Sequence, residues 1–128
     1  MPNKVRTKNK RGLKVVAIVF ALLFALFAGF QYNDPDPEVW ISIYGLAALA
    51  SVMALVGAAR PWFLWLMAAL YVVAALYQWP PHFEGFLLDE MGMKTVNIEL
   101  AREAGGLAIC ALAMGILAMY SQQITANR

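Results

Sequence analysis

Charged residues are scarce in this chain: Asp, Glu, Lys and Arg make up 14% of its 128 residues, and hydrophobic residues make up 62%. A soluble domain usually carries about 25% charged and about 45–50% apolar residues. The mean hydropathy of +0.62 agrees with this imbalance. The composition excludes a cytosolic enzyme of conventional design, and the excess of aromatic and branched apolar residues excludes intrinsic disorder.

Cysteine and histidine occur once each, as Cys110 and His82. A single cysteine excludes an intrachain disulfide framework, a CxxC pair and a cysteine-based metal site. The sequence also lacks a glycine-rich phosphate loop and a nucleophile elbow, so an enzyme is the less favoured class, and we predict no catalytic residues and no cofactor. A metal site is a weaker alternative because its ligands would follow no ExxH or HxxxH spacing; they would come from His82, Glu84, Glu99, Glu103, Asp34 and Asp36.

Four long apolar runs dominate the rest of the chain. They cover about residues 13–32, 37–59, 61–79 and 98–120. Each is close to the roughly 20 residues that a helix needs to cross a hydrocarbon core about 30 Å thick. Backbone polar groups must be paired in lipid, and the alternating pattern of barrel strands is absent. We therefore predict an all-α integral membrane protein, a four-transmembrane-helix bundle in one domain, residues 13–128, after a basic arm, residues 1–12.

The charges are distributed unevenly along the chain. Six of the ten basic residues fall in the first fourteen positions, and all eight acidic residues come after position 33. Four crossings would place eight basic residues and no acid on the side of the termini. The positive-inside rule then makes both termini cytoplasmic, in the inner membrane if the protein is bacterial. A basic arm that leads directly into an apolar run is typical of a topology signal, so we predict the lipid bilayer as partner and no nucleic acid.

Local signals predict how the helices begin and pack. Asp36 followed by Pro37 is typical of an N-cap and a first helical residue, and Asn97 is a second candidate N-cap. Only Ala59 and Arg60 separate the second and third runs, which predicts a tight antiparallel hairpin.

Small residues repeat every four positions, which favours close helix packing in lipid; they are Ala17, Ala21, Ala25 and Gly29 in the first run and Ala50, Ala54 and Ala58 in the second.

The fourth run contains many glycines and alanines and is thin along most of its length. We expect this helix to lie centrally or against a partner. Other membrane-protein subunits and self-association are therefore open as partners. The long segment before it mixes acids with phenylalanine, leucine and methionine, which favours a surface-lying segment.

Polar residues gather in two groups on the expected outer face. The first leads into the second helix, and the second group, at i, i+3 and i+4, shares one face of the fourth helix. Charges at the edge of the hydrocarbon are functional candidates because they are costly there unless paired or hydrated. The candidate cluster consists of Gln31, Asn33, Asp34, Asp36, Trp40, Tyr44, Glu99, Arg102 and Glu103. Each group also fits a purely structural role, as a capped turn and as an ordinary helix start with an internal Glu99–Arg102 ion pair.

These two groups carry a resemblance to a known family. The stretch 31–40, QYNDPDPEVW, resembles the Q-x-N-D-P-D-x-x-x-W signature of the transmembrane protein 220 family, and the stretch 99–107, ELAREAGGL, is similar to its E-x-x-R-E-x-x-G-L block. The resemblance implies a small multi-helix membrane protein of unassigned molecular function. It supplies no substrate.

We interpret the chain as a structural or accessory membrane component with a polar cluster at its outer face. We expect Arg102 to pair with Asp34 or Asp36, so that both groups form one rigid cap. The alternative is a binding or transport protein for a small ligand or ion at the outer membrane interface, which the concentration of charge there favours.

Overall fold

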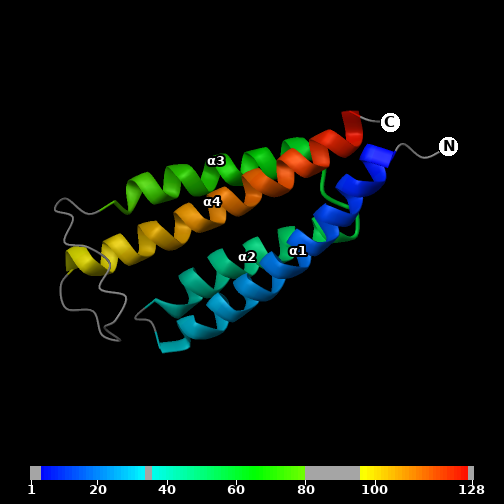
Figure 1. Ribbon diagram of the computed structural model, residues 1–128. Coiled ribbons are helices and arrows are strands. Elements are labelled where there is room, and N and C mark those ends of the chain that lie inside the picture. Colours follow the sequence, from blue (N-terminus) through cyan, green and yellow to red (C-terminus); the bar gives the residue numbers. More distant parts are fainter. Residues whose placement is uncertain (1–3, 34–35, 80–95, 127–128) are drawn as a thin grey trace.

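A computed structural model describes residues 4–33, 36–79 and 96–126, and these fold into helices that run side by side (Figure 1). The helices are α1 (Lys4–Phe30), α2 (Pro37–Leu55), α3 (Pro61–Tyr77) and α4 (Val96–Ala126), and a 3-10 turn, η1, spans Gln31–Asn33. The described residues thus confirm the all-helical class. The start of α1, the end of α4 and the α2–α3 connection lie at one end, called the termini end below. The opposite end, with η1 and the start of α4, is called the motif end.

Among the residues that the structure describes, three helical segments are long and apolar enough to cross a membrane, as judged by length and composition. They are Lys8–Asn33, Pro37–Leu55 and Leu100–Ile124. Helix α3 is also apolar, but it has only 17 residues. At 1.5 Å per residue it rises about 26 Å, slightly less than a hydrocarbon core of about 30 Å.

Helix α4 is central to the packing. Within the described residues, α1 and α2 pack together, α3 packs on α4, and α4 also contacts both α1 and α2. The central position that the small residues of the fourth run favour is therefore confirmed. The largest fully buried side chains include Phe24 of α1, Leu64 of α3, and Leu107, Met114 and Leu117 of α4.

Two helix ends differ from their predicted positions. Helix α1 begins at Lys4 and not near residue 13, so the basic residues continue the apolar helix. Helix α4 begins at Val96, which places Asn97 inside the helix, and the predicted Asn97 N-cap is wrong. Asp36 does occupy the N-cap position of α2, where its carbonyl accepts hydrogen bonds from the amides of Val39 and Trp40 at 3.2 and 3.4 Å. Its side chain makes no capping hydrogen bond.

Helix α2 ends at Leu55, four residues before the predicted end, because Gly57 has a φ of +76°. Glycine adopts this left-handed conformation without the steric penalty of a Cβ atom. The Ala58 amide donates to the Met53 carbonyl at 2.7 Å and the Gly57 amide donates to the Ala54 carbonyl at 3.2 Å. This pair of bonds is a Schellman motif, which terminates the helix. The α2–α3 connection therefore has five residues, 56–60.

The predicted small-residue stripe of α1 is only partly a packing surface. Ala17 is fully buried, but Ala25 and Gly29 are exposed. A repeat of exactly four residues turns about 40° further round a helix at each step, because each residue turns about 100°. The stripe therefore leaves the core, and Phe24 takes over the buried face. In α2 the stripe is confirmed at Ala50 and Ala54, whereas Ala58 lies beyond the end of the helix.

Candidate functional site

The first polar group lies on η1 and the start of α2, at the motif end. The Gln31 side-chain amide donates to the Phe27 carbonyl at 3.1 Å, so it satisfies a carbonyl near the end of α1. Asn33 and Asp36 are exposed. Asp34 lies outside the described residues.

Trp40 and Tyr44 point into the core. Their exposed fractions are 4% and 7%, so neither side chain contributes to a polar surface at the motif end. The Tyr44 ring packs edge-on against Phe27 with ring centroids 5.4 Å apart, and Trp40 follows at 6.4 Å from Tyr44. Edge-to-face aromatic pairs at such separations are attractive beyond their buried area. Tyr44 therefore joins α2 to α1, and Trp40 packs beside it on α2.

The second polar group opens α4 at the same end. Arg102 and Glu103 are half-buried and lie about two turns into the helix. Glu99 is also in α4, but its side chain lies outside the described residues. The structure thus brings the starts of α2 and α4 to one end of the molecule.

Tyr44, which follows the first motif, lies close to Gly106 of the second. A Cβ atom at Gly106 would overlap the Tyr44 hydroxyl oxygen and lie 3.1 Å from Tyr44 Cζ. Only glycine leaves room for the tyrosine here, because it has no side chain. Gly106 is the glycine of the second motif block, and Tyr44 follows the first. The sequence singles out both stretches, but it could not predict that Tyr44 and Gly106 touch, because they are 62 positions apart and no local pattern indicates such a contact.

Metal binding has no support among the residues that the structure describes. They contain no group of three or more His, Cys, Asp or Glu side chains placed to hold an ion. His82, Glu84 and Asp34, which the metal alternative also needs, lie outside these residues. The segment 80–97 was predicted to lie on the membrane surface; its residues 80–95 are outside the described residues too, and residues 96 and 97 belong to α4.

At the termini end, two contacts fasten α4 to its neighbours. The Trp65 indole N–H donates to Gln122 Oε1 at 3.2 Å, which ties the start of α3 to the end of α4. A Cβ at Gly12 would lie 3.0 Å from Tyr120 Cε1, so α1 also approaches α4 closely. Neither the Trp65–Gln122 contact nor the Gly12–Tyr120 contact was predicted from the sequence.

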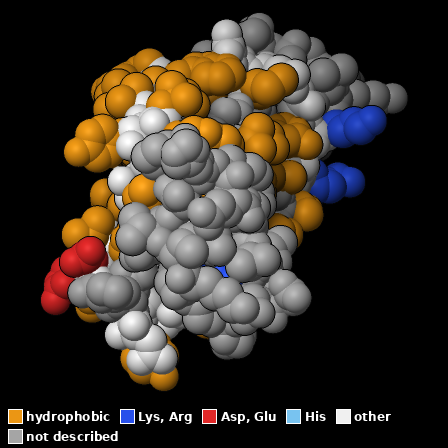
Figure 2. Space-filling view, turned by 90° about the vertical axis from the view of Figure 1, so that its left-hand side faces the viewer, with side chains coloured by type: hydrophobic (Ala, Val, Ile, Leu, Met, Phe, Trp, Pro, Cys, Tyr) orange, Lys and Arg blue, Asp and Glu red, His pale blue; other side chains and the backbone are white. Residues whose placement is uncertain are grey.

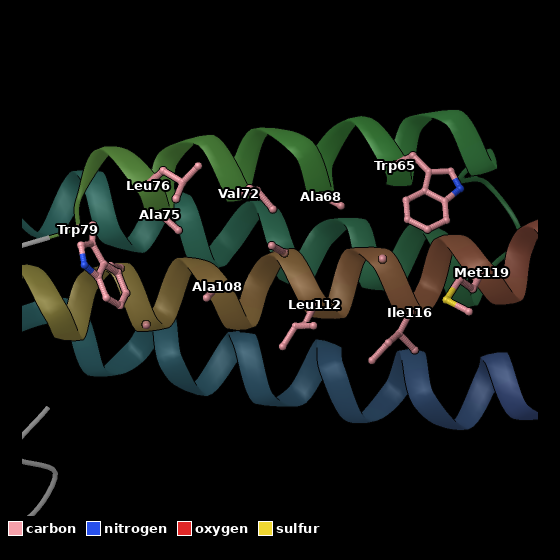
Figure 3. A pocket seen from close by; sticks show the side chains of 14 residues that line it. Trp65, Ala68, Val72, Ala75, Leu76, Trp79, Ala108, Leu112, Ile116 and Met119 are labelled. Carbon is pink, nitrogen blue, oxygen red and sulfur yellow. The ribbon is translucent and has the colours of Figure 1, made fainter. Parts of the chain in front are cut away.

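An apolar groove runs between α3 and α4 (Figure 3). It encloses about 640 Å³. Trp65 of α3 and Trp79, two residues after the end of α3, lie at its two ends; fourteen residues of helix would span about 21 Å. Its α4 wall includes the small residues Ala108 and Gly115, and its rim includes Leu112, which is 68% exposed. The small residues of the fourth run were the signal for this groove.

Charges of opposite sign are separated on the molecular surface. Viewed from the motif end, acidic side chains are seen at one edge and basic side chains at the opposite edge (Figure 2). Lys8, Lys10, Arg11 and Lys14 of α1 are all exposed.

The comparison with known proteins agrees with the two motifs. The family model described as "Transmembrane family 220, helix" matches residues 23–119. Both motifs, at 31–40 and 99–107, fall inside this range. No curated protein and no solved structure matches the chain. Together with the apolar helices, the match over most of the chain shows that this membrane protein belongs to transmembrane family 220.

Proposed function

We propose that the chain is a structural or accessory component of a membrane, with four crossing helices and a structural cap at the motif end. The observation that carries this proposal is the close approach of Tyr44 to Gly106. It makes a glycine of one motif and an aromatic residue beside the other into packing partners in the core. Residues with this role hold helices together and do not need a ligand.

The test of this role is the replacement of Gly106 by Ala. The new Cβ would force Tyr44 to move, and overpacking of this kind costs about 1–3 kcal/mol. We expect this loss in the free energy of unfolding, measured by SDS titration in mixed micelles. The matched control is Gly45→Ala in α2, where a Cβ would meet nothing within 4 Å. The control should be neutral or stabilising by up to about 1 kcal/mol because Ala favours the helix.

Tyr44→Phe removes the hydroxyl that the new methyl would meet. The double variant Gly106→Ala with Tyr44→Phe should therefore lose less than the sum of the two single losses. If Gly106→Ala is as stable as the unchanged protein, the structural role of the two motifs is contradicted.

The four-crossing arrangement includes α3 although it is short. Its start is bound to the end of α4 through Trp65 and Gln122. Further along, the Tyr71 hydroxyl donates to the Ile43 carbonyl of α2 at 2.8 Å. The groove beside α4 then continues to Trp79. Contacts along this length favour α3 as a fourth crossing, and the tryptophans near its two ends suit the two interfaces.

The accessory role requires a surface for a partner, and the α3–α4 groove suits an apolar transmembrane helix of another subunit. Small residues along the α4 wall let a second backbone approach closely in lipid. The groove of about 640 Å³ would receive the side chains along one edge of such a helix. Its length of about 21 Å covers most of the hydrocarbon thickness.

A photo-reactive residue at position 112 tests this surface in native membranes. Leu112 is 68% exposed on the groove, and Val73 is 64% exposed on α3 outside it. We expect a discrete protein adduct from position 112, none from position 73, and loss of the adduct when Gly115→Leu fills the groove. A tagged second copy in the adduct would show self-association in place of another subunit. Equal labelling from both positions would contradict the surface.

A further inference from the structure

The first turns of α1 are helical although they precede the apolar run. Helix α1 spans 27 residues, Lys4–Phe30, and therefore rises about 40 Å. A hydrocarbon core is only about 30 Å thick, so about 10 Å of this helix must emerge from it. The emerging end is basic, since the first acidic residue of the chain is Asp34.

The basic side chains of this end share one side of the helix. At about 100° per residue, Lys8, Lys10, Arg11 and Lys14 lie within an arc of about 160°. All four are exposed. The rest of the helix surface faces the protein, where Leu13 is buried and Gly12 approaches Tyr120 of α4. The packing against α4 therefore turns the basic side outward and fixes its direction.

The position of these residues along the helix axis determines which negatively charged groups can reach them. Lys14 directly follows the buried Leu13, and Lys8 lies about 9 Å further out along the helix axis. This span is close to the Debye length of about 8 Å at physiological salt, so all four charges act at the membrane surface. Their aliphatic stems can lie along the apolar boundary while the charged groups stay hydrated.

We propose that this basic side of α1, formed by Lys8, Lys10, Arg11 and Lys14, binds the headgroups of anionic phospholipids. Clusters of basic residues immediately beside a transmembrane helix attract negatively charged lipids. Nucleic acid also offers phosphates, but it does not enter the headgroup layer where Lys14 lies. The binding would hold α1 at a fixed depth, and it goes beyond the structural role proposed above.

The experiment uses the full chain reconstituted in phosphatidylcholine vesicles, with tryptophan fluorescence as the readout. Trp62 and Trp65 lie at the same end, near the start of α3, and are 67% and 42% exposed. Trp79 is 52% exposed at the other end and contributes equally in all variants, so a change that depends on the basic side comes from Trp62 and Trp65. Lipids with brominated acyl chains quench a tryptophan that they touch. Brominated phosphatidylglycerol should bind about threefold or more tightly than brominated phosphatidylcholine, and salt should weaken this preference.

Two variants separate charge from folding. The variant with Lys8, Lys10, Arg11 and Lys14 all replaced by Gln should lose the preference, while quenching by brominated phosphatidylcholine stays unchanged and shows normal insertion. The variant Lys8→Arg, Lys10→Arg, Lys14→Arg should keep the preference. The proposal is overturned if the unchanged protein shows no preference, if the Gln variant retains it, or if an RNA oligonucleotide binds these residues in place of the lipid.

Discussion

At the scale of single residues, the residues in and beside the two motifs divide into packed ones and exposed ones. Trp40, Tyr44 and Gly106 are buried or closely packed, whereas Asn33 and Asp36 are exposed. The sequence grouped Trp40 and Tyr44 with the polar residues because Trp40 ends the first motif and Tyr44 follows it. Their burial depends on which face of α2 meets α1, and this follows from packing against Phe27 rather than from the motif itself.

Replacing Arg102 tests whether the polar residues of the cap form one site. Arg102 is half-buried at the motif end, and we predict that it pairs with Asp34 or Asp36. Arg102→Ala would leave a carboxylate without its cation. Breaking a fully buried pair costs about 3–5 kcal/mol, so a half-buried pair should lose roughly 1–3 kcal/mol in the free energy of unfolding, measured by SDS titration.

Lys94→Ala is the control, since it removes the same formal charge from the segment between α3 and α4. It should lose less stability than Arg102→Ala. Combining Arg102→Ala with Asp34→Asn or Asp36→Asn should recover part of the loss, because the unpaired charge is also removed. Strictly additive losses in both double variants would show that the two groups do not form one site.

At the scale of helices, the sequence predicted which four segments form apolar helices better than it predicted their ends, and α3 is shorter than a membrane span. Length and apolarity are properties of each segment by itself, so they are readable along the chain. The ends of α2 and α4 were wrong for local reasons. Glycine often ends a helix, but the apolar run continues past Gly57, so the end of α2 was predicted too late in the chain. Asn97 has the residue type of an N-cap but lies within the first turn of α4.

Packing of α1 gives a prediction with an internal control. Ala17 is fully buried, and Ala25 lies two turns further on the same repeat but is exposed. Ala17→Leu should destabilise the protein by about 1–3 kcal/mol through overpacking. Ala25→Leu adds the same atoms on the exposed side and should be nearly neutral. The measurement is the midpoint of thermal unfolding in detergent, and equal midpoints for the two variants would contradict the packing of α1.

At the scale of the whole molecule, the charge asymmetry of the sequence and the two ends of the structure agree. The exposed basic residues of α1 and the exposed Arg60 of the α2–α3 connection lie toward the termini end, and Asp36 and Glu38 lie at the motif end. The orientation in a membrane depends on whether α3 crosses. That question decides the side of the C-terminus, since three crossings separate the termini and four bring them together.

Two reporter fusions distinguish these arrangements. With four crossings and the basic residues inside, a reporter after Arg128 should be active only in the cytoplasm and one inserted near Gly92 only outside. If α3 stayed on the inner side, the crossings of α1, α2 and α4 would place Gly92 inside and Arg128 outside. Both reporters would then change sides together. The swapped result would therefore exclude four crossings with the basic residues inside, which is the arrangement that the contacts of Trp65 and Tyr71 and the charge asymmetry favour.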